Sequence, residues 1–216
     1  MASSNAGGTE DLLSSLGCVR CMHIETRALG EVVVLVPEAF HDDRGFFLES
    51  FRADQFRSLG LPHEFLQDNH SQSTRGVVRG LHFQYDAPMG KLMRVTVGSA
   101  YLVAVDVRPG SPTLGQWFGI EASAENRRQV WAPAGFARGF CVLSEVAEVQ
   151  YKCTAIYNQQ GESGIRWDDP ALGITWPVAD VKVSAKDRRA PTLEQWLQSP
   201  TASRLQFAAP AESLNR

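Results

Sequence analysis

Short runs of apolar residues, separated by turns that contain glycine and proline, recur along the chain from residue 31 onward. The run 31–36 (EVVVLV) is closed by Pro37 and is typical of a buried strand. The segments 91–97 (KLMRVTV) and 147–153 (AEVQYKC) alternate between apolar and polar positions, as strands with one buried face do. The same kind of pattern predicts further strands at 45–51, 77–83, 100–107, 116–122, 129–133 and 140–144.

Helical patterns are few and short. Residues 53–59 predict one helix, which Gly60 ends. Residues 192–198 predict a second, preceded by Pro191 and followed by Pro200. Many short strands with almost no helix predict an all-β fold, either an antiparallel sandwich or a barrel.

The length of 216 residues suits one sizeable domain. Residues 1–22 are mostly small and polar, so we expect a flexible N-terminal extension there. The patterned part spans 23–199, and the sequence predicts a C-terminal tail at 200–216.

Composition excludes several classes of function. Hydrophobic residues make up 44% of the chain and charged residues 21%, which is typical of a globular protein. The net charge of −3 gives no electrostatic case for nucleic acid, so an anionic small ligand would need a local cluster of Arg and Lys. No apolar run approaches the ~20 residues of a membrane helix. The N-terminus lacks the basic start and apolar core of a secretory signal, so we expect a cytoplasmic protein.

The four cysteines do not predict a metal or redox site. Cys18 and Cys21 form a single C-x-x-C, without the second pair or the βαβ context that zinc or redox chemistry needs. Cys141 and Cys153 lie within strand patterns, and we expect them to be buried apolar fillers.

Candidate chemistry is concentrated in the stretch 68–84 (DNHSQSTRGVVRGLHFQ). A regular strand would place Arg79 and His82 on opposite faces. If both serve one pocket, the strand must contain a bulge, and Gly80 is where a bulge forms most easily. A single strand histidine is more often a satisfied core residue than a catalytic one, so His82 alone would decide nothing.

Several longer motifs point to a known family. In chain order they are DDRGFFLESF, LQDNHSQSTRGVVRGLHFQ, GKLMRV, VAVDVRPGSPTLGQW, SAENRRQVWAPAGFARGF, YKCTAIY, IRWDDPALGITWP and SAKD. With these motifs the chain from about residue 31 to 196 resembles the dTDP-4-dehydrorhamnose 3,5-epimerase family. The resemblance implies a cupin-type jelly-roll sandwich with a few short peripheral helices, which agrees with the strand pattern.

The resemblance also implies a substrate, a dTDP-linked 4-keto-6-deoxyhexose, whose C4 carbonyl makes the protons at C3 and C5 acidic. His82 would be the base, because histidine titrates near neutrality, and Asp187 would orient its imidazole. Lys91 would stabilise the enolate oxygen, and Tyr151 would return a proton from the opposite face. Without the resemblance, Lys91 could equally be a surface lysine at a strand end and Tyr151 a half-buried strand tyrosine.

Further positions would bind the substrate by the same resemblance. Tyr157 would stack on the thymine ring. Arg138 stands in GFARGF where the family usually has histidine, a position that the resemblance places at the phosphate end of the site. The remaining positions expected to contact nucleotide, diphosphate or sugar are Arg44, Glu49, Gln67, Asp68, Asn69, Arg79, Glu162 and Lys186.

We expect no metal and no cofactor. Metal-binding cupins usually supply an H-x-H pair, a later Glu and a histidine after P-x-G. Here the first segment offers only His82, and Arg138 follows the P-x-G at 133–135, so too few ligands remain.

The resemblance further implies a homodimer in which an N-terminal strand is exchanged and the partner completes part of the site. The strand 31–36 and the region of Arg44 are the expected donors. Two alternatives stay open: a related enzyme that inverts only C3 or only C5, and a non-catalytic cupin that binds a nucleotide sugar.

Overall fold

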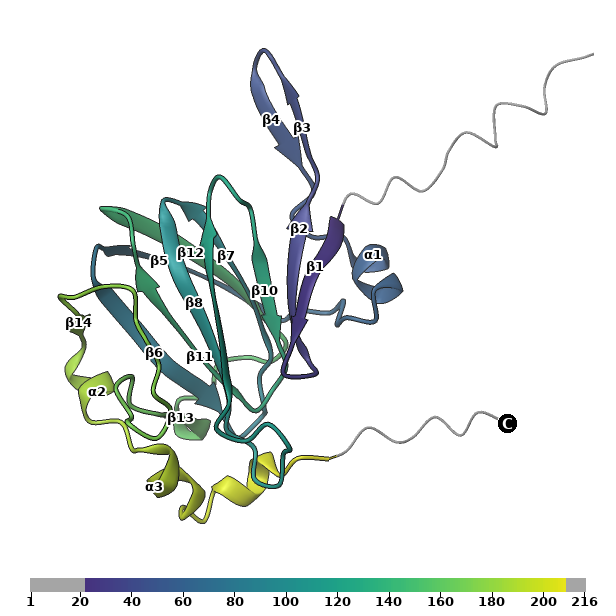
Figure 1. Cartoon of the computed structure of the whole chain (residues 1–216). Coiled ribbons are helices and arrows are strands. Elements are labelled where there is room, and N and C mark those ends of the chain that lie inside the picture. Colours follow the sequence, from purple (N-terminus) through teal and green to yellow (C-terminus); the bar gives the residue numbers. More distant parts are fainter. Residues whose placement is uncertain (1–21, 209–216) are drawn as a thin grey trace, which may run out of the picture.

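A computed structural model of the chain describes residues 22–208. Two sheets, which we call sheet I and sheet II, face each other (Figure 1). In spatial order sheet I contains β1 (Met22–Ala28), β2 (Val32–Pro37), β10 (Gln129–Ala132), β7 (Lys91–Val97), β12 (Val146–Cys153) and β5 (Gln67–Thr74). Sheet II contains β13 (Glu162–Gly164), β6 (Val77–Gln84), β11 (Phe136–Val142), β8 (Ser99–Asp106) and β9 (Trp117–Ser123).

Strand pairing within both sheets is antiparallel, except that the short β14 (Lys182–Val183) pairs with β6 in parallel. The helices are short and peripheral, as predicted: α1 (Ala53–Ser58), α2 (Ala185–Arg188), α3 (Leu193–Leu197) and the 3₁₀ turns η1 (Gln159–Gly161) and η2 (Ala202–Leu205). This arrangement confirms the all-β sandwich that the alternating patterns predict.

The main core fills the space between the sheets. Val34, Val95 and Val149 of sheet I pack in one cluster with Leu102 and Phe140 of sheet II, and all five are at most 4% exposed. The strands therefore alternate as the sequence predicts: every second side chain points into the space between the sheets. This core holds the two sheets as a rigid frame for the residues at its open end.

Two smaller clusters cover the outer faces of the sheets. On sheet I, Phe56 of α1 packs on the outward residues Leu35 and Trp131. On sheet II, the Trp196 ring of α3 meets Phe83 edge to face at 4.7 Å. Burial of aromatic rings of this size contributes roughly 2–3 kcal/mol each, so both clusters fix the peripheral helices in place.

The C-terminal segment packs on sheet II further than the sequence predicts. Residues 200–216 read as a tail, yet Ala202 and Leu205 are only 3% and 5% exposed within the Trp196 cluster. The guanidinium of Arg108 also stacks on Phe207, 4.9 Å from the ring centroid. The segment up to residue 207 therefore belongs to the folded body.

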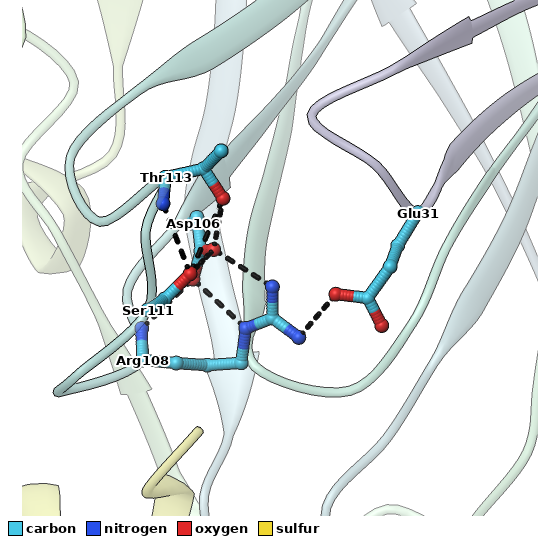
Figure 2. Close-up of polar contacts among 5 residues, drawn as sticks. All are labelled: Glu31, Asp106, Arg108, Ser111 and Thr113. Atoms are coloured by element: carbon cyan, nitrogen blue, oxygen red, sulfur yellow. Dashed lines mark hydrogen bonds and ion pairs between the residues drawn. The ribbon is translucent and has the colours of Figure 1, made fainter. Parts of the chain in front are cut away.

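A buried polar network closes one end of the sandwich (Figure 2). The Asp106 carboxylate, fully buried at the end of β8, accepts hydrogen bonds from the Arg108 Nε and Nη2 at 2.9 and 2.7 Å. The hydroxyls of Ser111 and Thr113 donate to its second oxygen at 2.5 and 2.7 Å. The same Arg108 pairs with Glu31 at the β1–β2 turn, at 2.6 Å. The network joins the turn after β8 to sheet I.

A two-stranded hairpin, β3 (Ala39–Asp42) and β4 (Gly45–Leu48), projects away from both sheets (Figure 1). Its phenylalanines are exposed, with Phe40 at 44%, Phe46 at 59% and Phe47 at 67%. Such apolar side chains on a projecting arm are unusual for a surface that faces only water.

Cys141 and Cys153 are buried free thiols, as predicted. Cys18, Cys21 and the predicted extension up to residue 21 lie outside the described residues. No helix within 22–208 is long and apolar enough to cross a membrane.

Candidate active site

Strand β6 carries one extra residue between Arg79 and His82. In its pairing with β11, His82 lies opposite Arg138 and Arg79 lies opposite Phe140, so three steps along β6 match two along β11. Gly80 has a φ of +131° at this point, a conformation that only glycine adopts readily. The bulge breaks the alternation, and Arg79 and His82 line the same cavity. The bulge expected at Gly80 is therefore confirmed.

His82 is held by a buried carboxylate from the far end of the chain. Its Nε2 lies 2.7 Å from Oδ1 of Asp187, which is 4% exposed. Burial alone would raise the pKa of Asp187, but the hydrogen bond and charge of His82 outweigh it, so the pKa lies below the usual range. Asp187 stays ionised and fixes the direction of the imidazole.

Sheet I supplies the facing wall. Lys91 at the start of β7 and Tyr151 on β12 point into the sandwich, and Lys91 Nζ lies 5.7 Å from the centroid of the Tyr151 ring. Burial lowers the pKa of Lys91, which makes its ammonium a better hydrogen-bond donor than that of an exposed lysine. Burial raises the pKa of Tyr151, so its phenol keeps its proton at neutral pH.

These residues line one cavity of about 480 Å³ between the sheets. Arg79, His82 and Asp187 lie on the side of sheet II and α2, while Lys91 and Tyr151 lie on sheet I. The volume suits a nucleotide-linked sugar better than a macromolecule. The arrangement places an imidazole, a cation and a phenol around one cavity, and proton transfer next to a carbonyl requires groups of these kinds.

The cavity is strongly cationic. Its lining includes five basic side chains and one carboxylate, that of Asp187; the basic residues are Arg79, Lys91, Arg138, Lys182 and Lys186. A chain of net charge −3 thus gathers positive charge at one place. This is the local cluster that an anionic ligand would need.

Five of the predicted binding residues form a connected group that includes Lys186 of the cavity wall. The Tyr157 backbone N–H donates to Gln67 at 2.8 Å, and the Tyr157 hydroxyl donates to Glu162 at 3.0 Å. Glu162 also forms an ion pair with Lys186. Asn69 lies beside Gln67, whose amide donates to it at 3.0 Å. The group leaves the Tyr157 ring about half exposed and open to stacking.

Arg138 lies at the floor of the cavity and is only 3% exposed. Its guanidinium donates to backbone carbonyls, among them that of Lys91. Burial lowers the pKa of Arg138 to about 9, so the side chain remains charged at neutral pH.

Three predicted site residues lie away from this cavity in the single chain. Asp68 points out of the opposite face of β5 from Asn69 and pairs with Lys152 at 2.9 Å. Arg44 and Glu49 lie on and just after the projecting hairpin. One chain by itself therefore does not bring these three side chains to the cavity.

The hairpin residues have local partners. Arg44 is exposed and pairs with Asp42 two residues earlier. Glu49 pairs with Arg52 at 3.2 Å. Neither contact directs the side chain toward the cavity.

Two positioning residues were not found from the sequence. Ser184 caps α2, accepting from the Asp187 N–H at 3.1 Å, and so fixes the turn that carries the carboxylate. The spacing S-x-x-D at 184–187 is a helix-start signal that could have revealed it. Ser73 accepts from Arg79 Nε at 2.9 Å, a contact that depends on the bulge and has no local signal.

Within 22–208, no group of three or more His, Cys, Asp and Glu side chains is placed to hold a metal ion. Beside His82 the nearest acid is Asp187, which the imidazole already engages.

Comparison with known proteins agrees with this geometry. The family model described as dTDP-4-dehydrorhamnose 3,5-epimerase matches residues 25–195. The dTDP-4-dehydrorhamnose 3,5-epimerase of Salmonella typhimurium is 50% identical over 173 residues, which are 79% of this chain and 94% of that protein. The enzyme of that name from Neisseria gonorrhoeae is 50% identical over 175 residues, 81% of this chain, but the match spans only 53% of its length.

A solved structure is similar over most of the chain. The 3,5-epimerase of Legionella pneumophila, in complex with dTDP-4-keto-L-rhamnose, has a TM-score of 0.82 and 44% identity, covering 87% of this chain and 100% of that one. This likeness supports the cupin-like form of the sandwich. A dTDP-4-dehydrorhamnose 3-epimerase from Streptomyces niveus is less similar, with 37% identity over 78% of this chain and 83% of that protein. The chain belongs to the dTDP-4-dehydrorhamnose 3,5-epimerase family.

Proposed function

We propose that the chain inverts C3 and C5 of dTDP-4-dehydro-6-deoxy-D-glucose to give dTDP-4-dehydro-L-rhamnose, with His82 as base and Tyr151 as acid. The observation that carries this is the placement of His82 with Asp187 on one wall of the cavity and of Lys91 with Tyr151 on the other. A binding module for nucleotide sugars has no need for all four groups.

The base is a neutral imidazole. When His82 donates its Nε2 proton to Asp187, Nδ1 is left as the basic nitrogen. It removes the proton next to the C4 carbonyl, and the ionised Asp187 stabilises the imidazolium that forms. The pair thus acts as a base that can also return its proton.

Lys91 stabilises the negative charge that develops on the C4 oxygen. Its ammonium is enclosed between the sheets, where the low dielectric strengthens the attraction to an oxyanion. Tyr151, whose pKa burial raises, holds a proton on the other side of the cavity from His82. Transfer from Tyr151 to the enolate carbon on the face opposite the base inverts that centre.

Residues beside the cavity recognise the nucleotide part of the substrate. Tyr157 offers an exposed ring for the thymine, with Gln67 and Asn69 beside it. Arg79 and Lys186 supply positive charge for the diphosphate. This division places the nucleotide outside and the sugar between the sheets.

The chain acts as a homodimer in this proposal, and the hairpin β3–β4 reaches the partner's site. β2 is already paired on both edges, with β1 and β10, so the hairpin rather than β2 is the exposed arm. Its Phe46 and Phe47 would be covered by the partner, and Arg44 would be carried to the partner's cavity.

Proton NMR in heavy water with dTDP-4-dehydro-6-deoxy-D-glucose tests the proposal. Deuterium is expected at both C3 and C5. Deuterium at C3 alone would make the chain a single-site epimerase, the activity named for the Streptomyces niveus relative. No exchange at either carbon, with the ligand still bound, would overturn the catalytic proposal.

The His82→Asn variant is the matched control. It should bind dTDP as the unaltered chain does, while exchange falls by about 10² or more, because a general base contributes about that much. Exchange at an unchanged rate would remove His82 from the mechanism.

A further inference from the structure

Arg138 is a buried cation without a carboxylate partner. It lies in the middle of β11 and is 3% exposed. Among residues 22–208 its guanidinium finds only backbone carbonyls as acceptors. Removing a charge from water is costly unless fixed dipoles or an opposite charge replace the hydration, so this position requires a structural reason.

The carbonyls come from both sheets. Within sheet II, Nε donates to Val103 of β8 at 3.2 Å. Across the sandwich, Nη1 donates to Lys91 of β7 at 3.3 Å, and both Nη atoms approach Val130 of β10 at 3.5 Å. One guanidinium therefore ties three strands together under the cavity, and two of them belong to the opposite sheet.

The same residue is also joined to the base. Arg138 lies opposite His82 in the pairing of β11 with β6, next to the bulge that turns His82 inward. The backbone of Arg138 thus pairs with the strand that carries His82, while its side chain donates a hydrogen bond to the carbonyl of Lys91. Among the described residues that line the cavity, Arg138 alone is paired with His82 across neighbouring strands and hydrogen-bonded to Lys91.

We propose that Arg138 is a positioning residue that fixes Lys91 relative to His82 by bonds across the sandwich, and that it does not act as a ligand for the diphosphate. The proposal rests on the catalytic roles given above to His82 and Lys91. The planar guanidinium of Arg138 can donate to several carbonyls at once, whereas a lysine has a single donor atom. Arginine and lysine therefore differ in how many strands they can hold at this position.

The test compares Arg138→Met, which removes the donors, with Arg138→Lys, which keeps the charge. Both are made in the unaltered chain and in a Lys91→Met background. The measurements are kcat and KM for the dTDP-4-dehydro sugar, the Kd of dTDP by calorimetry, and Tm as a check of folding. If Arg138 acts through Lys91, the effects of the two residues on kcat will not add.

We expect Arg138→Met to lower kcat by about 10- to 100-fold, a size that fits a small misplacement of a catalytic group. The Kd of dTDP should stay within about threefold, and Arg138→Lys should recover part of kcat. In the Lys91→Met background the same replacement should change kcat by less than about threefold.

Three results would overturn the proposal. A Kd of dTDP weakened tenfold or more with kcat unchanged would make Arg138 a phosphate ligand. A lower Tm with kcat unchanged would make it a structural residue only. If Arg138→Met lowers kcat in the Lys91→Met background by the same factor as in the unaltered chain, Arg138 acts independently of Lys91. If Arg138→Met does not fold, kcat and Kd of Arg138→Lys in both backgrounds decide the same question.

Failure of this proposal is distinguishable from failure of the proposed function. If the unaltered chain exchanges neither C3 nor C5, the function is wrong. If it exchanges both and the Arg138 variants do so equally fast, only the positioning role is wrong.

Discussion

Lys91 and Tyr151 stand side by side on neighbouring strands, with the ammonium of Lys91 5.7 Å from the centroid of the Tyr151 ring. The pairing of β12 with β7 sets this distance, because Cys153 lies opposite Lys91 and Tyr151 lies opposite Met93. The sheet itself thus places the two groups for which we propose the roles of enolate stabiliser and acid.

Replacing Lys91 tests whether its charge stabilises the enolate. Lys91→Met should lower kcat by about 10²- to 10³-fold, the loss typical of one oxyanion-stabilising donor. KM should change little, because the charge on oxygen develops only in the transition state. Steady-state kinetics on the dTDP-4-dehydro sugar checks this. A rise in KM with kcat preserved would show that Lys91 only binds the ground state.

Tyr151→Phe separates proton removal from proton return. His82 and Lys91 stay intact, so deuterium should still enter the sugar from the His82 side. Formation of the inverted product should fall by about 10²-fold or more, because no acid remains on the opposite face. NMR that follows exchange and product in the same sample measures both. Product formed at the normal rate would move the acid role to another group.

Asp187→Asn tests the orientation of the base. The amide is neutral and cannot stabilise the imidazolium, so kcat should fall by about 10²-fold or more while the Kd of dTDP stays unchanged. The control is Asp168→Asn, an exposed acid that pairs with Arg166 outside the cavity. Equal losses in both variants would argue against a special role for Asp187.

The Asp106 network should make stability depend on pH. Burial opposes ionisation of Asp106, but hydrogen bonds from Arg108, Ser111 and Thr113 outweigh it and lower its pKa. A lowered pKa stabilises the fold above the unfolded value of about 3.9, and this contribution is lost as the pH falls through the folded value. Asp106→Asn should therefore cost about 2–4 kcal/mol in the free energy of unfolding at pH 7.

At pH 3 the difference between Asp106→Asn and the unaltered chain should be smaller. Urea unfolding at both pH values measures it. The exposed Glu125→Gln serves as control and should leave the unfolding curve close to that of the unaltered chain at pH 7. A difference that grows as the pH falls would show that the carboxylate is not the stabilising group.

The hairpin phenylalanines should govern association. Phe46→Ser with Phe47→Ser should convert a dimer into a monomer, because burial of two exposed rings would otherwise drive pairing. Light scattering gives the mass. Leu66→Ser, 61% exposed in another part of the surface, should leave the dimer intact. An unaltered chain that is already monomeric would refute the dimer.

Much of the fold could be predicted from alternation. The segment 91–97 coincides with β7, and the run 31–36 is shifted by one residue from β2. β5 was not predicted as a strand, because QDNHSQST contains few β-branched or aromatic residues. It lies at the edge of sheet I, where polar side chains cost little.

The site was predictable only in part. The order of the site motifs along the chain and the bulge at Gly80 could be inferred from the sequence. Which side of the sheet each residue of the edge strand β5 faces could not. Asp68 and Asn69 are neighbours in sequence and point to opposite sides of β5. The burial of Arg138 and the projection of the hairpin depend on contacts between distant segments, and local patterns hold no record of these.

The extra residue in β6 has a consequence for protein design. A programme that rewards regular pairing would replace Gly80 with a strand-forming residue and pair β6 with β11 residue for residue, without the bulge. With every residue kept, the chain beyond Gly80 would turn by half a pleat, and Arg79 and His82 would lie on opposite sides of the sheet. In this sandwich, the more regular sheet would take the proposed site apart.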